Sequence, residues 1–320
     1  MDIGDRRTAW ALLSRAARGP CRSLQDLVAA VGVESAAEAV LAGKVPNSVD
    51  RRVLKRADLA ATHHDLEVVA GLGGRLVTPD DAEWPAECFA SFADPVAASS
   101  QMDYVAPLAL WVLGSPSLRL TAERGAAVIG ARCSTDYGNG LASGIAADFV
   151  QHGWSVASGA AYGIDAAGAR GAVAAGGTAV AVLPTGLDRP YPAQLRPLID
   201  TIASTGGLVV SELPPGTVVS RADFLHRNRL TAALSRVVVV VEAGLRSGTV
   251  NTVGWAGCLG RAVYATPGPV TSAASAGCHQ LIREGLATLV TCADEVIAAV
   301  EHRSMPPLSP RAVAHGQVQP

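Results

Sequence analysis

Short loops rich in glycine and hydroxyl side chains follow several apolar runs of this sequence. They include GARCSTDYG at 130–138, SGAAYGID at 158–165 and EAGLRSGTVNT at 242–252. A glycine turn before a helix leaves backbone N–H groups free at the helix start, where the helix dipole favours an anion. Arg132 and Arg246 lie within two of these loops, and a guanidinium can donate two hydrogen bonds to one phosphate. The loops therefore predict a shared site for an anionic ligand.

Two further loops extend this pattern. PTGLDRPYP at 184–192 is rigid and contains Gly186 and Arg189, and TPGPV follows at 266–270. A single loop of this kind is usually only a turn followed by a helix cap. In that interpretation Asp165 caps the helix and does not bind a ligand. Several loops of this type at one sheet edge favour a common ligand.

The segment FLHRNRL places Arg227, Asn228 and Arg229 shortly before a run of five valines. We expect a helix that leads into a buried strand, with Arg227 and Asn228 facing the ligand edge and with Leu225 and Leu230 packed inward. In one interpretation the arginines bind phosphates. In the other they solvate the helix and pair with carboxylates.

The sequence shows no arrangement typical of nucleophilic or metal catalysis. The 7 histidines show no HExxH-like spacing, and Ser158 and Ser247 have no histidine nearby in the chain. The 6 cysteines form no CxxC pair. GARCSTDYG is not GxGxxG, and no acidic residue ends the next strand, which disfavours a dinucleotide. We expect no metal, no cofactor and no disulfide framework.

A doubly wound α/β sheet is expected to position these loops. The predicted strands are continuous apolar runs, typical of parallel strands that are covered on both faces. They span 126–131, 155–158, 178–184, 207–212, 236–243, 261–268 and 287–291. Sequences long enough for helices separate most of them, and ligands of such sheets bind beyond the carboxyl ends of the strands.

The chain divides into four predicted regions. Residues 1–72 read as a small all-α domain of the sterile-alpha-motif or helix-hairpin-helix kind, because apolar residues recur there at helical spacing between glycine breaks. Residues 73–124 are expected to be a linker with one strand at 108–115. Residues 125–300 form the Rossmann-like domain, and 301–320 a Pro-rich disordered tail.

Composition limits the classes of function. Of 320 residues, 49% are hydrophobic and 17% charged, so the chain can form an ample core. The net charge of −2 means that any site for a polyanion must be a local patch. No apolar run is long enough to cross a bilayer, and the N-terminus lacks the apolar core of a signal peptide. We expect a soluble, cytoplasmic protein without membrane contact.

These motifs together resemble the DNA-processing protein A family, also called DprA or Smf. The resemblance covers roughly residues 75–300, and the motifs occur in the family's order and spacing. They are GARCSTDYG, SGAAYGID, LPTGLDRPYP, SELPPGT, FLHRNRLTAALS, VVVEAGLRSGT, RAVYATPG and AGCHQLIREG.

The resemblance implies an extended Rossmann fold that dimerises through the sheet domain. It also implies a non-catalytic role in natural transformation, or competence. Proteins of this family bind incoming single-stranded DNA, protect it and help load the RecA recombinase. The implied partners are therefore single-stranded DNA, RecA and a second copy of the chain.

The family's motifs carry over residue by residue. Its GSR motif matches Gly130, Ala131 and Arg132, which makes Arg132 the first candidate DNA contact. The SG…GID, F-x-x-RNR and SG(S/T) motifs supply the others, and Gly186 and Arg246 complete the set. The predicted DNA- and phosphate-binding residues are Gly130, Arg132, Ser158, Gly159, Gly163, Asp165, Gly186, Phe224, Arg227, Asn228, Arg229, Arg246, Ser247, Gly248 and Thr249.

The chain departs from the family's pattern at three places. Gly168 and Ala169 stand where the family has Ala-His, and Arg170 is the nearest polar neighbour. The dipeptide FL replaces the usual F-P before RNR. The chain ends in a short Pro-rich segment where relatives often have a winged-helix domain, so we expect no second DNA-binding module.

Two other functions remain open from the sequence. One is a Rossmann-like nucleotide enzyme of the phosphoribohydrolase (lysine decarboxylase-like) type. In that type a glutamate follows a PGGxGT loop, whereas RSGTVNTVGW has no carboxylate and Glu242 lies before it. The other is a nucleotide-sensing module, since a mononucleotide and a DNA phosphate suit the same loops.

Overall fold

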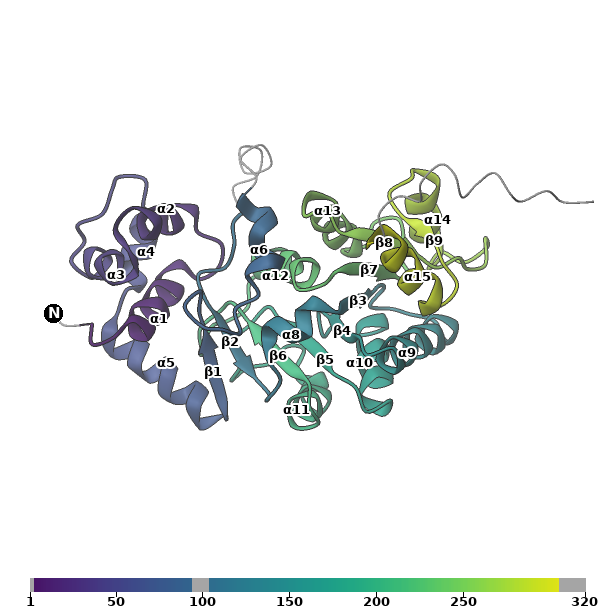
Figure 1. Cartoon of the computed structure of the whole chain (residues 1–320), viewed down its shortest axis with the longest axis horizontal. Helices are drawn as coiled ribbons and strands as arrows, with labels where there is room; N and C mark the ends of the chain where they lie inside the picture. The colour runs from purple at the N-terminus through teal and green to yellow at the C-terminus, as the bar shows by residue number, and fades with distance from the viewer. Residues whose placement is uncertain (1–2, 94–103, 305–320) are drawn as a thin grey trace, which may run out of the picture.

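The computed structural model describes residues 3–93 and 104–304, and a single nine-stranded sheet lies at its centre (Figure 1). The strand order is β1-β2-β6-β5-β4-β3-β7-β8-β9. The strands are β1 (Gly74–Val77), β2 (Leu110–Leu113), β3 (Gly125–Ile129), β4 (Ser155–Ser158), β5 (Ala179–Leu183), β6 (Leu208–Ser211), β7 (Val237–Val240), β8 (Ala262–Ala265) and β9 (Thr288–Leu289).

The sheet is mostly parallel and wound in two directions. From β3 the chain proceeds through β4 and β5 to β6 on one side, then crosses back to β7 and continues to β8 and β9 on the other. β3 and β7 pair in parallel, with Ala126 opposite Val237 and Ile129 opposite Val240. Only β2 runs against the other strands, because it pairs antiparallel with both β1 and β6. The boundary between β3 and β7 is therefore the topological switch point of a doubly wound fold.

Helices cover both faces of this sheet. Val237 and Val239 belong to one hydrophobic cluster, and Val238 and Val240 belong to the other, as period-2 alternation requires. The first cluster includes residues of α9 (Asp136–Gln151), α10 (Ile164–Ala174), α11 (Arg196–Ser204) and α15 (Ala293–Ser304). The second includes residues of α6 (Ala86–Phe89), α8 (Leu118–Glu123), α12 (Arg221–Ala233), α13 (Thr249–Cys258) and α14 (Ala276–Arg283).

Five helices precede the sheet: α1 (Arg6–Ala17), α2 (Arg22–Val31), α3 (Val33–Leu41), α4 (Arg51–Arg56) and α5 (Leu59–Gly71). Side chains of α1, such as Leu12 and Leu13, belong to the same hydrophobic cluster as Trp111 of β2. The Nη1 of Arg7 also donates to the Leu76 carbonyl of β1, at 2.5 Å. These helices are therefore packed directly against the antiparallel end of the sheet.

The structure corrects several sequence-based expectations. The linker region contains two strands and not one. The strand expected at 108–115 is β2, and the four-residue β1 pairs with it. Leu225 is 48% exposed and does not pack inward, whereas Leu230 is buried. Helix α15 continues to Ser304, so the helix extends into the predicted tail, and residues 305–320 lie outside the described part. In the described part of the chain, no helix has both the length and the apolar character to cross a membrane.

Candidate functional site

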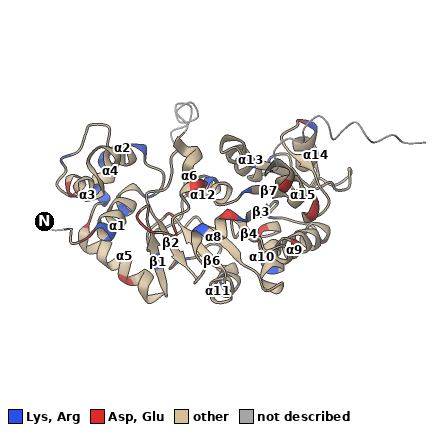
Figure 2. Ribbon diagram, viewed as in Figure 1, with Lys and Arg blue, Asp and Glu red and all other residues tan. Residues whose placement is uncertain are grey.

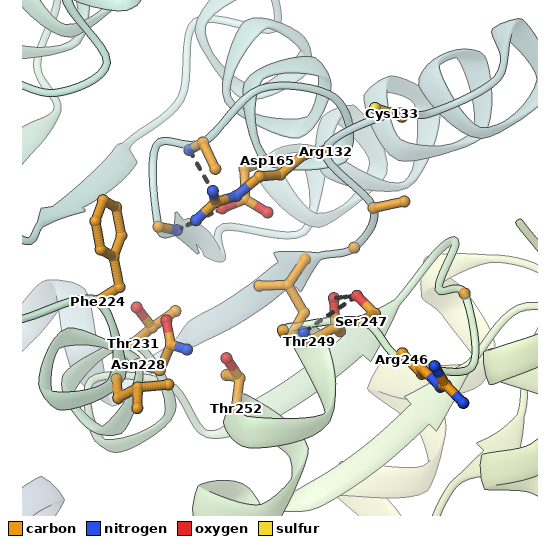
Figure 3. Close-up of a pocket in the computed structure, with 18 of the residues that line it drawn as sticks. Arg132, Cys133, Asp165, Phe224, Asn228, Thr231, Arg246, Ser247, Thr249 and Thr252 are labelled. Atoms are coloured by element: carbon orange, nitrogen blue, oxygen red, sulfur yellow. Dashed lines mark hydrogen bonds between the residues drawn. The ribbon is translucent and has the colours of Figure 1, made fainter. Parts of the chain in front are cut away.

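A pocket of about 1180 Å³ lies at the switch point, beyond the carboxyl ends of β3 and β7 (Figure 3). Its lining residues fall within 129–135, 159–165, 219–231, 244–252 and 272–274. We call it the switch-point pocket. Open α/β sheets bind their ligands at this position, because the connections on the two sides of the switch point turn away from each other.

The loop after β3 is fixed to the end of β7 by Thr135 and Glu242. Thr135 caps α9 by accepting a hydrogen bond from the Gly138 N–H at 3.1 Å. The buried Glu242 carboxylate accepts from the Thr135 backbone N–H at 2.9 Å and from its hydroxyl at 2.5 Å. A Cβ at position 138 would overlap that carboxylate, so glycine permits this close contact. Glu242 thus holds the loop in place and does not line the pocket.

The loops after β3 and β4 are in direct contact with each other. Gly163 adopts a φ of +74°, and a Cβ there would overlap the Ala131 carbonyl. Ile164 N–H donates to that same carbonyl at 3.2 Å. Glycine is needed at this position both for its left-handed backbone and for the close approach. The contact places Arg132 between two helix starts.

Arg227 lines the pocket but is buried, and its guanidinium is bonded to main-chain carbonyls. Its Nη1 donates to the Gly159 carbonyl, and to the Val182 carbonyl at 2.8 Å. Asp165 accepts from the Gly159 N–H at 3.0 Å and from the Ala161 N–H at 3.4 Å. Burial lowers the pKa of Arg227 to about 10 and raises the pKa of Asp165, while the attraction between the two charges acts against both shifts. Arg227 thus joins the ends of β4 and β5, and Asp165 fixes the loop after β4.

Arg229 lies away from the pocket, although the sequence predicts it as a phosphate-binding residue. Its side chain is 0% exposed and forms a two-bond ion pair with Glu212, at 2.7 and 2.8 Å. Its Nε donates to the Val105 carbonyl at 3.1 Å. A guanidinium enclosed in this way is not available to a phosphate. We therefore do not retain Arg229 as a proposed phosphate contact.

Three exposed arginines surround the pocket: Arg132, Arg221 and Arg246. None of them forms an ion pair with a carboxylate of the described residues. The Cζ of Arg132 lies 5.3 Å from the ring centroid of Phe224, and Tyr191 meets that ring edge-on at 5.6 Å. Positive and negative residues also lie elsewhere along the ribbon, among them the basic residues of α4 (Figure 2).

Hydroxyl and amide side chains complete the opposite wall. The Ser247 hydroxyl donates to the Thr249 hydroxyl at 2.8 Å and accepts from the Thr249 N–H at 3.2 Å. Asn228 donates to Asn251 at 3.1 Å, which links α12 to α13. Figure 3 shows Asn228, Thr231 and Thr252 grouped across from Arg132, with Arg246 at a separate rim. The pocket is therefore polar at its walls and cationic at its rim.

Most of the predicted site residues line this pocket. They are Gly130, Arg132, Gly159, Asp165, Phe224, Arg227, Asn228, Arg246, Ser247, Gly248 and Thr249. Ser158 is buried below it, where its hydroxyl accepts from the Ala160 N–H at 3.2 Å. Gly186 packs against the Pro214 carbonyl, and Gly163 lies in an adjoining groove. Gly186 and Ser158 therefore serve the loops and do not line the pocket.

Arg221 is a lining residue that the sequence motifs did not identify. It is the first residue of α12, which begins with a capping box between Ser220 and Asp223. The Ser220 N–H donates to Asp223 at 2.7 Å. Arg221 precedes Phe224 by three residues, so the two lie on one face of the helix. That spacing within the predicted helix is the signal that could have revealed it.

Comparison with known proteins places the chain in one family. Residues 75–301 match the model of the DNA recombination-mediator protein A family. A putative DNA processing protein DprA of Mycobacterium tuberculosis is 48% identical over 294 residues, which cover 92% of this chain and 75% of the relative. Protein Smf of Escherichia coli is 37% identical over 171 residues, covering 53% of this chain and 46% of that one.

Two solved structures share the fold. DNA processing protein A of Streptococcus pneumoniae superposes with a TM-score of 0.72 at 28% identity, covering 92% of this chain and 97% of that one. A structure of DNA processing protein A of Helicobacter pylori, which addresses its single-stranded DNA binding mode, gives a TM-score of 0.60 at 26% identity over 72% of this chain and 97% of that one. The expected extended Rossmann-like sheet is thus confirmed. The chain belongs to the DNA recombination-mediator protein A family.

Proposed function

We propose that this chain binds single-stranded DNA in the switch-point pocket, protects it, and helps load RecA recombinase onto it during natural transformation. The observation that supports this most strongly is the set of exposed, unpaired guanidiniums of Arg132, Arg221 and Arg246 around one pocket. The single-stranded DNA binding mode described for the Helicobacter pylori relative supports the same ligand.

The proposed contacts divide between phosphates and bases. Arg132, Arg221 and Arg246 neutralise phosphates, because a guanidinium offers paired donors to phosphate oxygens. The ring of Phe224 is half-buried and offers a surface on which a base can stack. A single strand can turn its bases into the pocket, whereas a duplex keeps them paired in its interior. This difference is our proposed basis for selecting single strands.

We propose that the pocket binds its ligand without chemical conversion. Among the described residues, Asp165 is the sole carboxylate that lines the pocket, and it already accepts from two backbone N–H groups. Glu242, the acid nearest to the SGT loop in sequence, is bonded to Thr135. Release of free base from AMP by the purified protein would favour the phosphoribohydrolase alternative.

The partners are part of the same proposal. RecA is proposed to receive the bound strand, and two copies are proposed to associate through the sheet domain. Light scattering on the purified protein, with and without oligonucleotide, tests the association. A monomeric mass in both conditions would contradict the dimer and leave the proposal for the pocket intact.

The pocket itself is tested with an Arg132→Ala variant. Fluorescence anisotropy of labelled oligo-dT, measured across a salt series, should show weaker binding and a salt slope reduced by about 0.7 for each phosphate that is no longer neutralised. Arg196→Ala is the matched control, because Arg196 is exposed on α11 and paired with Asp200 at 3.6 Å. Equal affinity of the Arg132→Ala variant and the parent at every salt concentration would place the DNA elsewhere.

A further inference from the structure

A second groove adjoins the switch-point pocket. It has a volume of about 800 Å³ and lies between the beginnings of α9 and α10. Arg132 and Cys133 line both cavities, so the two meet at the loop after β3. We call it the α9–α10 groove and define it by Arg132, Asn139, Gly140, Ser143, Ala167 and Arg170, which lie along it.

Small residues form the floor of the groove. A Cβ at Gly140 would meet no atom within 4 Å, so the space above this residue is open. Farther along, the two helices are in close contact, because a Cβ at Gly171 would lie 2.7 Å from the Ser143 Cα. The groove is thus closed beneath by helix packing and open above Gly140, which leaves room for an extended chain.

The charged side chains that line the groove are both arginines. Arg132 lies at the junction with the pocket, and Arg170 lies on α10, both exposed. Arg170 is six residues into the helix, or about 9 Å along its axis from Ile164. Neither arginine pairs with a carboxylate of the described residues, and the lining contains no acidic side chain. Asp136 is exposed in the first turn of α9 but does not line the groove.

We propose that the α9–α10 groove carries the same DNA strand onward from the switch-point pocket, with Arg170 holding a phosphate beyond the one held by Arg132. This inference rests on the proposed function. An anionic, flexible, single-stranded polymer fits because the groove meets the pocket at Arg132, is open above Gly140 and is lined by two arginines and no carboxylate. The pocket then binds one part of the strand, and the groove directs the next part across the starts of two helices.

The test compares two lengths of oligo-dT, about 5 and about 20 nucleotides, within the range of single-stranded binding sites. For Arg170→Gln, affinity for the long oligonucleotide should fall about fourfold at 0.15 M salt, with the salt slope reduced by about 0.7, as expected when one fewer phosphate is neutralised. Affinity for the short one should not change. Arg196→Gln is the charge-matched control and should match the parent with both lengths.

A second variant tests the groove by shape. Gly140→Leu projects a side chain into open space, and leucine is a better helix former than glycine, so the variant should fold. It should weaken binding of the long oligonucleotide alone. If both variants bind the long oligonucleotide as the parent does while Arg132→Ala binds weakly, the groove proposal is wrong and the pocket proposal stands. If the parent binds neither length, the proposed function itself fails.

Discussion

Arg227 lines the pocket and holds neighbouring main chain in place. It is 6% exposed and bonds the carbonyls of Gly159 and Val182 at the ends of two adjacent strands. Its pKa of about 10 keeps it protonated at neutral pH. Because Arg132 lies close enough to contribute to that lowered pKa, Arg227 adds positive charge from beneath the pocket. Arg132, which is exposed, is the guanidinium near Arg227 that is accessible from the pocket.

The reactivity of the Cys133 thiol can be used to measure DNA binding at the switch-point pocket without any mutation. Its thiol is exposed and lines both the switch-point pocket and the α9–α10 groove. We expect saturating oligo-dT to slow alkylation of Cys133 by iodoacetamide, because bound DNA covers the loop after β3. Cys258 is an internal control, since it is also exposed and lines neither cavity. Mass spectrometry of the peptides measures both rates, and equal rates at Cys133 with and without DNA would argue against this site.

Asp165 predicts a pH dependence of stability. Because burial raises its pKa, the folded protein binds a proton at pH values where the unfolded chain is already ionised. The contribution of Asp165 to the free energy of unfolding should therefore fall as pH rises from the unfolded value of 3.8 through the raised pKa. Urea unfolding of the parent and of Asp165→Asn, at a series of pH values, should show this fall in the parent only. A constant difference between the two proteins would contradict it.

The sequence predicts which residue types surround the pocket better than it predicts which way their side chains point. Arg227 and Arg229 are two residues apart on α12, which places their side chains roughly 200° apart around the helix axis. One meets the ends of β4 and β5, and the other meets Glu212. A motif of alternating arginines does not reveal which one is enclosed, because that depends on how α12 is rotated against the sheet.

At the scale of elements, the connection from β6 to α12 joins the site to the N-terminal helices. The Ser14 hydroxyl of α1 donates to the Glu212 carbonyl at 3.5 Å, and Arg18 donates to the Val218 carbonyl at 2.7 Å. The same connection leads to Ser220, the N-cap of α12. Helix α1 thus supports the segment from which Arg221 and Phe224 reach the pocket.

The ion pair of Arg229 and Glu212 should contribute strongly to this support. Arg229→Met leaves a buried carboxylate uncompensated, and breaking a buried pair in this way costs about 3–5 kcal/mol. We expect a loss of that size in the free energy of unfolding, measured in urea. The double variant Arg229→Met with Glu212→Gln should recover part of it, because no buried charge then remains. A loss below about 1 kcal/mol in the single variant would show that the pair contributes little.

Strand and helix order could be predicted from the sequence, but short edge elements could not. The six strands β3 to β8 are mostly buried apolar runs, so hydrophobicity alone reveals them, whereas the two residues of β9 are both exposed. β1 consists of four residues, GRLV, of which two are half-buried. A run of this length carries too little periodicity to distinguish it from a loop. Its pairing with β2 depends on contacts that are remote in sequence.

For the whole molecule, the N-terminal helices and the sheet share one hydrophobic cluster. Leu13 of α1 is fully buried in it, together with Trp111 of β2. Leu13→Ala should therefore cost roughly 2–5 kcal/mol, as large-to-small core substitutions do. Thermal unfolding, followed by circular dichroism and tryptophan fluorescence, should remain a single transition at a lower temperature. A separate early transition, with the main one unchanged, would instead indicate an independent domain ending near residue 72, as predicted from the sequence.

The switch-point pocket has one consequence for how the chain can be divided. The residues that line it lie in five separate segments between positions 129 and 274. No single segment supplies the whole wall of the pocket. A synthetic peptide that copies any one motif would present its arginines without the opposing wall. Limited proteolysis between β5 and β6 would place Arg132 and Arg221 on two different fragments. A cleaved protein that still binds the ligand must therefore keep the two fragments associated.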